Sequence, residues 1–526
     1  MSDLNSDTTA EKESAEQHEH EHEHEHDHEV IPPNLRRVCD DISPWVYLVA
    51  VVELAERFTY RSITAPMQNY IQYTRDDLRP GALGRGQSVA TGINYFYSGW
   101  CYLTPIFGAI IADSYLGRFR TIWLGTGIMV LGSLILFLTS LEPSLDHGAG
   151  MPGLMVSLVL IGIGTGCITS NVNPLIAEQY TERRERVKML DSGEMVVVDP
   201  HMTLTTMYGR YFLIINVGAL SVIPASWLEL KVAFWASFLL SLCFWTLPIL
   251  ALVIGRNRYV VHQPRESPLV KASKVLYLRV RHGSFDSVKA LGACDQGFVE
   301  ELKRALVACR VFPIFWICYG QTNSNIVSQA ATMQTFGIPN DMMGFFNPIS
   351  AFMLVPLMER VVYPTLQRWK MPFKPITRIT VGFLAMACAI AYAAGIQHLI
   401  YTSPPCYDTP LGAECSQNGK LPNQVNVFLQ LPIHALTSLS EILAYVSGLE
   451  YAYTKAPKSM KSIVTSIFLV MFTVGCALGI TLSPVSKDPK VLVEYASLSG
   501  VMVVTAGVFW MLFNKYNEVE EKMNQM

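Results

Sequence analysis

Three ionisable residues lie close together within one long apolar stretch. Glu53, Glu56 and Arg57 fall inside a hydrophobic run from about Pro44 to Tyr70, and about 20 apolar residues suffice to cross a bilayer as a helix. Charges at that depth are costly, so they face a bundle interior or a water-filled cavity and form pairs. Residues three and four positions apart share a helical face, so both carboxylates lie beside the guanidinium. Two carboxylates crowding one cation can hold an extra proton, because like charges resist ionising together. We predict a proton-responsive cluster; the alternative is a packing triad that only fixes helix orientation.

A further carboxylate stands alone in an apolar run of the second half of the chain. Glu441 lies between Ser440 and Ile442 in a stretch with few other charges. An intramembrane carboxylate needs a partner, and a substrate ammonium group is a suitable one. A salt bridge to another helix is the alternative.

The composition is that of a polytopic membrane protein. Half of the 526 residues are hydrophobic, only 16% are charged, and the mean hydropathy is positive. Ordinary soluble proteins of this length are less apolar. The formal net charge of −3 offers no basic surface for a nucleic-acid partner. We expect the lipid bilayer as the surroundings and a monomer as the working unit.

Apolar runs recur steadily from Pro44 onward in two sets of six, and a window search for apolar stretches predicts about twelve transmembrane helices. The predicted spans are 44–72, 87–114, 119–141, 153–179, 204–226, 231–255, 307–337, 343–366, 376–402, 424–454, 460–483 and 491–514. The predicted fold is therefore an all-α membrane protein with two six-helix bundles around a central cavity, the layout of alternating-access carriers. The predicted domains are a tail (1–43), the first bundle (44–255), a linker (256–306), the second bundle (307–516) and a short tail (517–526). No filter-like segment of a channel and no nucleotide-binding sequence is present in the chain.

Basic residues cluster in every second loop. The loops 142–152 and 403–423 are poor in Lys and Arg, so the positive-inside rule predicts that both termini and the linker lie in the cytosol. The basic residues of the other loops are Arg118, Arg120, Arg183, Arg184, Arg186, Lys188, Arg256, Arg258, Lys271, Lys274, Arg279, Arg281, Arg368, Lys370, Lys374, Lys455, Lys458 and Lys461. Arg75, Arg79 and Arg85 after the first span are the exception. We expect the plasma membrane as the location. The mixture of basic and apolar residues from Pro268 to Val311 predicts a surface helix before the seventh span.

The first 43 residues are acidic and low in apolar content, which predicts a disordered cytosolic tail. Histidines alternate there with Glu or Asp at positions His18, His20, His22, His24, His26 and His28. Such a repeat can bind Zn²⁺ or Ni²⁺ weakly, but we favour a solvated tail and predict no metal site. Of the eleven cysteines only Cys406 and Cys415 share a polar loop, and a disulfide and a free pair are equally compatible with the sequence.

The loop after the second span reads Gly108-Ala-Ile-Ile-Ala-Asp113-Ser-Tyr-Leu-Gly117-Arg118-Phe-Arg120 and resembles the signature loop of the major facilitator superfamily. Glycines let two helix ends approach closely, and Asp113 can pair with Arg118 or Arg120. We predict that these three form a conformational latch; the arginines serve as a topology signal in any case.

Several further motifs, in the right order, resemble the proton-dependent oligopeptide transporter family and its fungal members, over about residues 44–516. They are Glu53-x-x-Glu56-Arg57-Phe58-x-Tyr60, Gly164-Thr-Gly166 to Tyr180, Phe212-Leu-Ile-Ile-Asn216-Val-Gly218-Ala-Leu220, Gln321 to Gln334, Asn347-Pro348 and Leu449 to Lys458. The resemblance implies a major-facilitator fold and no enzymatic activity. It also implies no cofactor, because the proton gradient supplies the energy.

The resemblance implies a role for each matching residue. Glu53, Glu56 and Arg57 would respond to protons, and Glu441 would meet the amino terminus of a peptide. The residues that would line the cavity and hydrogen-bond the peptide backbone are Tyr60, Tyr97, Asn216, Gln321 and Asn347. For Tyr97 and Asn216 the alternative is interhelical hydrogen bonding.

Two positions depart from the family pattern. Thr169 stands where the fourth span usually carries a lysine, and Arg61 stands where a second tyrosine usually follows Tyr60. Arg61 can replace the missing cation, or it can point away, because adjacent residues do not share a helical face.

We therefore predict a secondary active transporter of di- and tripeptides or peptide-like small molecules, coupled to protons by alternating access. The alternatives are an exporter of a secondary metabolite, a carrier of nitrate or another small anion on the same fold, and a non-transporting nutrient sensor.

Overall fold

The structure is a computed structural model that describes residues 35–524, except for short internal segments. The positions outside the description are 76, 78–80, 181, 183–184, 190–192, 257, 261–267, 286, 288–295, 370–372, 412–413, 417–420 and 456–460. The histidine-rich repeat predicted to be a disordered tail lies outside the described residues.

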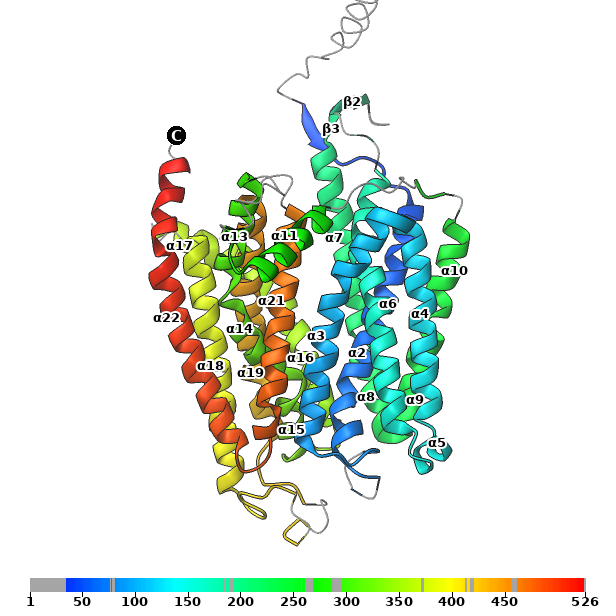
Figure 1. Cartoon of the computed structure of the whole chain (residues 1–526), viewed down its shortest axis with the longest axis vertical. Coiled ribbons are helices and arrows are strands. Elements are labelled where there is room, and N and C mark those ends of the chain that lie inside the picture. The colour runs from blue at the N-terminus through cyan, green and yellow to red at the C-terminus, as the bar shows by residue number, and fades with distance from the viewer. Residues whose placement is uncertain are drawn as a thin grey trace, which may run out of the picture. The chain divides into compact units, whose positions relative to one another are not determined.

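Long helices fill the part of the chain predicted as the first bundle (Figure 1). They are η1 (Pro44–Leu48), α2 (Ala50–Gln72), α3 (Gln87–Ile111), the π turn η2 (Ala112–Leu116), α4 (Arg118–Thr139), α5 (Glu142–Asp146), α6 (Gly150–Glu178), α7 (Pro200–Ala219), α8 (Val222–Lys231), α9 (Phe234–Phe244) and α10 (Thr246–Gly255). The fifth and sixth predicted spans are each divided in two, α7 from α8 and α9 from α10.

The second part begins with two linker helices, α11 (Pro268–His282) and α13 (Gln296–Cys309). The helices that follow are α14 (Phe312–Gly320), η3 (Gln321–Asn323), α15 (Asn325–Ala331), η4 (Asn340–Phe345), α16 (Phe346–Leu357), the π turn η5 (Met358–Val362), α17 (Tyr363–Arg368), α18 (Pro375–Thr402), η6 (Val427–Gln430), α19 (Leu431–Ser440), the π turn η7 (Glu441–Val446), α20 (Ser447–Lys455), α21 (Lys461–Leu482), η8 (Ser483–Val485) and α22 (Val491–Asn524). The predicted surface helix is present as α11, whose Leu269, Ala272 and Val275 are buried in the same core as Phe315.

Nine helical segments of the described chain are long and apolar enough to cross a membrane. The predicted spans that are not among them are 44–72, 87–114 and 307–337. The first contains four charged side chains in α2, the second carries many polar side chains in α3, and the third is broken at η3. These three segments hold polar groups inside the molecule, and they supply much of the candidate site.

Helices α3 and α6 approach closely because glycines face each other. A Cβ on Gly108 would lie 2.2 Å from the carbonyl oxygen of Gly166, and a Cβ on Gly166 would lie 2.4 Å from the carbonyl carbon of Thr104. Small residues permit such close packing of helices within a membrane, where van der Waals contact drives association. The contact fixes α3, which carries Tyr102, against α6, which carries Thr165.

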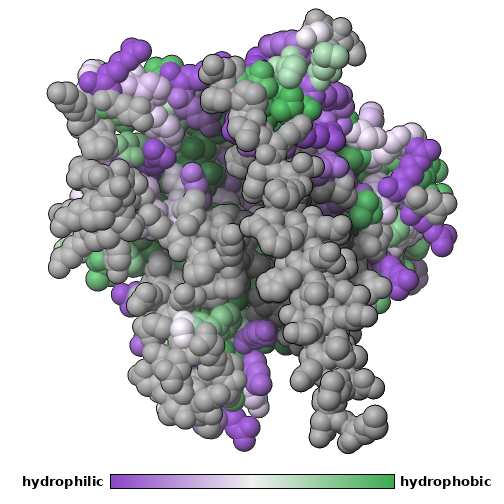
Figure 2. Space-filling view, turned by 90° about the horizontal axis from the view of Figure 1, so that it is seen from above, coloured by the Kyte–Doolittle hydropathy of each residue, from purple (hydrophilic) through white to green (hydrophobic). Residues whose placement is uncertain are grey.

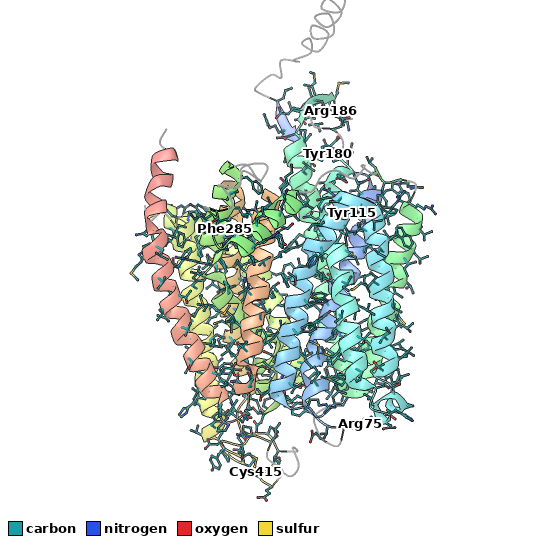
Figure 3. The ribbon with its side chains drawn as sticks, viewed as in Figure 1. Arg75, Tyr115, Tyr180, Arg186, Phe285 and Cys415 are labelled. Atoms are coloured by element: carbon teal, nitrogen blue, oxygen red, sulfur yellow. A yellow bond between two sulfur atoms is a disulfide. The ribbon has the colours of Figure 1, made fainter. Side chains whose placement is uncertain are left out.

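The helix ends of residues 44–179 and 211–526 gather at two opposite ends. Tyr115 and Phe285 lie at one end, and Arg75 and Cys415 lie at the other (Figure 3). A view onto the first of these ends shows hydrophilic side chains around the margin of the described surface (Figure 2). Exposed basic residues of this part include Arg120, Arg256 and Arg258.

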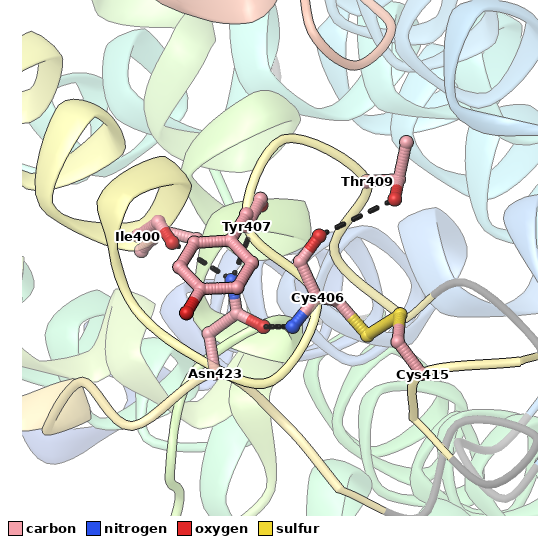
Figure 4. The surroundings of a disulfide bond; sticks show 6 residues. All are labelled: Ile400, Cys406, Tyr407, Thr409, Cys415 and Asn423. Carbon is pink, nitrogen blue, oxygen red and sulfur yellow. Dashed lines mark hydrogen bonds between the residues drawn. A yellow bond between two sulfur atoms is a disulfide. The ribbon is translucent and has the colours of Figure 1, made fainter.

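The structure contains a disulfide between Cys406 and Cys415, which the sequence left open. Asn423 organises its surroundings (Figure 4). The Asn423 side chain accepts a hydrogen bond from the backbone N–H of Cys406 at 3.3 Å and donates to the carbonyl oxygens of Ile400 at 2.8 Å and Tyr407 at 3.4 Å. A disulfide of this kind persists in an oxidising compartment.

The described residues of 35–43 and 180–210 belong to a separate unit, which contains a three-stranded sheet in the order β1-β3-β2. Strand β1 (Arg36–Val38) pairs in parallel with β3 (Met195–Val198), and β2 (Arg186–Met189) pairs antiparallel with β3. Residues 36–38 therefore depart from the predicted disorder of the tail. The Lys188 ammonium donates to Asp41 at 2.7 Å and holds the pKa of that carboxyl below its ordinary value.

Candidate functional site

The three predicted ionisable residues of α2 form one contact cluster. The guanidinium of Arg57 lies 3.6 Å from a carboxylate oxygen of Glu53 and 3.5 Å from one of Glu56. Glu53 is 2% exposed and Glu56 is fully buried, whereas 36% of the Arg57 side chain is accessible. One guanidinium therefore faces two buried carboxylates and opens onto a space that water can enter.

Helix α6 supplies the remaining contact of Glu56. The Thr165 hydroxyl donates to Glu56 Oε1 at 2.9 Å. The other oxygen of Glu56 and the Oε2 of Glu53 receive no hydrogen bond within the described part of the chain.

The charge of Arg61 lies near enough to interact with Glu56, five residues earlier on α2, and with Glu441 on η7. These interactions favour the orientation toward the site over the one that points away. Thr169, which stands in the usual place of the lysine, donates its hydroxyl to the Thr165 carbonyl oxygen at 2.9 Å. A second cation thus enters the site from α2 instead of from α6.

Tyrosines connect the α2 cluster to the second half of the chain. Tyr102 of α3 lies within electrostatic range of both Arg57 and Glu441, and Tyr445 of η7 lies within range of the same two residues. Both rings are partly accessible. Side chains from the two halves therefore approach one another here, although the sequence signalled no role for either tyrosine.

Glu441 begins the π turn η7, between α19 and α20. A π turn inserts an extra residue into a helix and is frequent at functional sites. The Tyr319 hydroxyl of α14 donates to Glu441 Oε2 at 3.4 Å. The Glu441 side chain is partly accessible and faces the same space as Arg61.

The other predicted cavity residues have different surroundings. Tyr60 is almost fully buried, and its hydroxyl lies 3.5 Å from that of Ser98. Tyr97 is fully buried and stacks on Tyr60 with ring centroids 5.5 Å apart. The Asn216 amide donates to the Phe212 carbonyl oxygen of its own helix at 2.7 Å.

Gln321 and Asn347 contribute to contacts within the second half. The fully buried Gln321 amide donates to Glu494 at 3.0 Å and to the Tyr95 hydroxyl at 3.1 Å. Asn347 is buried and accepts a hydrogen bond from Ser438 at 2.5 Å. In this conformation these amides are occupied by protein groups and do not line an open cavity.

A hollow of about 180 Å³ lies between α3 and α21, away from the α2 cluster. Its lining is apolar and includes Phe96, Trp100, Leu103 and Ile480. None of the predicted site residues contributes to it.

Two of the three residues predicted to form a latch, Asp113 and Arg118, lie in contact. The Arg118 guanidinium lies 3.7 Å from Asp113 and 2.5 Å from Glu178, the last residue of α6. Arg120 is exposed and takes part in no ion pair found within the described residues. Glu178 is thus a partner that the loop motif alone did not identify, because it comes from 60 residues further along the chain.

Within the described residues, no group of three His, Cys, Asp or Glu side chains is arranged to hold a metal ion.

Known proteins resemble this chain over most of its length. The profile of the POT family matches residues 119–499. Peptide transporter PTR_B of Candidozyma auris is 44% identical over 502 residues, covering 94% of this chain and 86% of that protein. Peptide transporter PTR2 of Saccharomyces cerevisiae is 39% identical over 503 residues, covering 94% of this chain and 82% of that protein.

Solved structures agree with the predicted fold. The POT family transporter PepTSo has a TM-score of 0.72 at 18% identity, covering 91% of this chain and 99% of its own. A crystal structure of an auto-inhibited POT family peptide transporter has a TM-score of 0.70 at 19% identity, covering 89% of this chain and 96% of its own. The predicted all-α fold of the major-facilitator type is confirmed, and this chain belongs to the POT family.

Proposed function

We propose that this protein is a secondary active transporter that moves di- and tripeptides, or peptide-like small molecules, by proton-coupled alternating access. The observation that carries the proposal is the approach of charges from the two halves. Arg61 of α2 interacts with Glu441 of η7, and Tyr445 of η7 interacts with Arg57 of α2. Relatives named peptide transporters at 39–44% identity support the same substrate class.

The proton acts at the cluster of α2. Arg57 can balance one negative charge, so Glu53 and Glu56 together hold a proton while both stay buried. When the proton leaves, the second carboxylate becomes ionised and attracts Arg57 and Arg61 more strongly. That attraction withdraws both cations from the chamber and from any substrate carboxylate, which couples proton release to substrate release.

The substrate lies between charges of opposite sign. Glu441 receives the ammonium group of a peptide, and the partly accessible Arg57 and Arg61 receive its carboxylate. Tyr102, which lies between them, hydrogen-bonds the peptide backbone. The other predicted residues bind the substrate when the two halves move and free their side chains. They are Tyr60, Tyr97, Asn216, Gln321 and Asn347.

The ion pairs of Arg118 with Asp113 and Glu178 hold the ends of α3, α4 and α6 together in one conformation. Arg120, exposed beside them, can join the latch in the other conformation. Rearrangement of these pairs accompanies the change of access.

The transporter works as a monomer in the plasma membrane, with both termini and the linker in the cytosol. The loop charges support this orientation, and the Cys406–Cys415 disulfide supports it from the opposite side. The proton gradient supplies the energy for transport, and no cofactor takes part.

Uptake of a labelled dipeptide into proteoliposomes that contain the purified protein tests the proposal. An inward proton gradient should drive accumulation, and unlabelled di- and tripeptides should compete whereas nitrate should not. Competition by nitrate instead would indicate an anion carrier, and flux only in the outward direction would indicate an exporter. Binding of the dipeptide without any flux would indicate a sensor.

A further inference from the structure

A second pair of buried carboxyl groups lies outside the α2 cluster. Glu229 is on α8 in the first half of the chain, and Asp341 is in η4 in the second half. Glu229 is 4% exposed and Asp341 is 2% exposed. Helix α8 packs against η4, and the Ser226 hydroxyl of α8 donates to Asp341, so the two carboxyl groups lie at one contact between the halves.

Each carboxyl group has one oxygen that is occupied by a donor. Asn69 of α2 donates to Glu229 Oε1 at 2.9 Å, and Ser226 donates to Asp341 Oδ2 at 2.5 Å. Asn69 and Asn340 exchange two hydrogen bonds, at 3.0 and 3.1 Å, which extend the contact between the halves. The remaining oxygens, Glu229 Oε2 and Asp341 Oδ1, are buried and receive no hydrogen bond from any described residue.

The neighbouring elements supply no positive charge to balance the pair. Helices α9, α15 and α16 pack against α8 or η4 and carry no Asp, Glu, Lys, Arg or His. On α2, the nearest titratable group is Tyr70, whose ring packs on Phe234, and the charged groups lie two or more turns away. On α8, Lys231 turns its ammonium over the Trp227 ring.

We propose that Glu229 and Asp341 bind one proton between them, and that this shared proton holds the two halves of the transporter together. Two ionised carboxylates in a dry contact repel each other, whereas a carboxylic acid donates a short, strong hydrogen bond to a carboxylate. Loss of the proton leaves two like charges at the junction and separates α8 from η4.

The pair lies at the end of the helices that carries Arg75, because Asn69 is in the last turn of α2. With the orientation of the proposed function, which this step rests on, that end faces away from the cytosol. Acid outside the cell therefore closes the outer junction, and the closed junction turns the chamber toward the cytosol. The shared proton is distinct from the one held by Glu53 and Glu56.

The distance between two spin labels across this end tests the inference without any substrate. The labels are attached at His147→Cys, in the loop before α6, and at Thr402→Cys, at the end of α18, in a background whose unpaired native cysteines are replaced. In the otherwise unchanged protein, the mean distance should lengthen as the pH is raised from about 5 to about 8.5, because the shared proton is lost.

E229Q and D341N should each keep the short distance over the whole range, because a neutral amide donates to the remaining carboxylate at any pH. S226A, which removes a donor but no titrating group, and E56Q, which alters the other proton site, should both retain the pH dependence.

A distance in the unchanged protein that is constant with pH would overturn the inference, and so would pH dependence that persists in E229Q and D341N. Shortening by Na⁺ at fixed alkaline pH would overturn it in favour of a cation site. A failure of dipeptide transport would leave these readings intact, so the two proposals are tested separately.

Discussion

Arg61 is the residue that most distinguishes this site, since it places a second cation beside a chamber that already contains Arg57. The sequence identified Arg61 as a departure but could not tell its orientation, because adjacent helical residues point in different directions. Its charge interacts with Glu441, so it competes with a substrate ammonium for that carboxylate and offers a partner to a substrate carboxylate. We therefore expect the site to favour peptides that carry an acidic side chain.

R61Y should shift the selectivity toward neutral peptides. We expect the ratio of acidic to neutral dipeptide uptake, measured as kcat/KM, to fall by about tenfold, equivalent to about 1.4 kcal/mol. R61K keeps the charge and should keep most of the ratio. An unchanged ratio in R61Y would show that Arg61 does not face the substrate.

E441Q should remove the partner of the peptide ammonium. Loss of a charged hydrogen-bond partner costs about 1.5–3 kcal/mol, so uptake of a free-amine dipeptide should fall by about tenfold to a hundredfold. An N-acetylated dipeptide should compete for binding equally well with both proteins. E142Q, at the exposed first residue of α5, is the matched control, and normal dipeptide uptake by E441Q would contradict the assignment.

The sequence predicted which residues form the α2 cluster, because charged side chains within an apolar span face the bundle interior and pair with one another. It could not predict which polar residues of the other spans meet the chamber. Gln321 and Tyr97 are as inward-facing as expected, but Gln321 is hydrogen-bonded to Glu494 and Tyr97 is packed on Tyr60. A sequence pattern therefore predicts which side chains face the interior of the bundle, but it does not predict which residues of other helices they contact.

At the scale of elements, the uninterrupted apolar helices matched their predicted spans closely. Helices α4, α6 and α18 begin and end within a few residues of the expected positions. The break at η3 and the π turn at η7 were not predicted, because apolar spacing does not record where backbone hydrogen bonds shift by one residue. The sequence also did not predict strands β1, β2 and β3. They are short and lie outside the apolar runs on which the prediction was based.

The contact of α3 with α6 leads to a prediction about stability. G108A adds a Cβ that would lie 2.2 Å from the Gly166 carbonyl oxygen, so the helices must separate. Overpacking of this kind costs about 1–3 kcal/mol, and the thermal midpoint of the detergent-purified protein should fall by several degrees. G127A is the control, because a Cβ there meets no atom within 4 Å. Equal midpoints for both variants would show that the helices accommodate the methyl group.

At the scale of the whole molecule, the two halves meet through polar contacts at more than one level. Arg61 of α2 interacts with Glu441, and Glu229 lies by Asp341 nearer the end that carries Arg75. In the two proposals each of these places holds a proton, so we expect the gradient to act at two points. We expect one to be coupled to the substrate and the other to closure of the outer end.

The measurement that tests the central claim most directly compares two modes of transport by E56Q in proteoliposomes. Proton-driven accumulation of a labelled dipeptide should be lost, because the α2 cluster can no longer release its proton. Exchange of labelled for unlabelled dipeptide without a gradient should survive, since the chamber and Glu441 are unchanged. Equal loss of both would contradict the account and would make Glu56 a structural residue, and undiminished accumulation would place the coupling proton elsewhere.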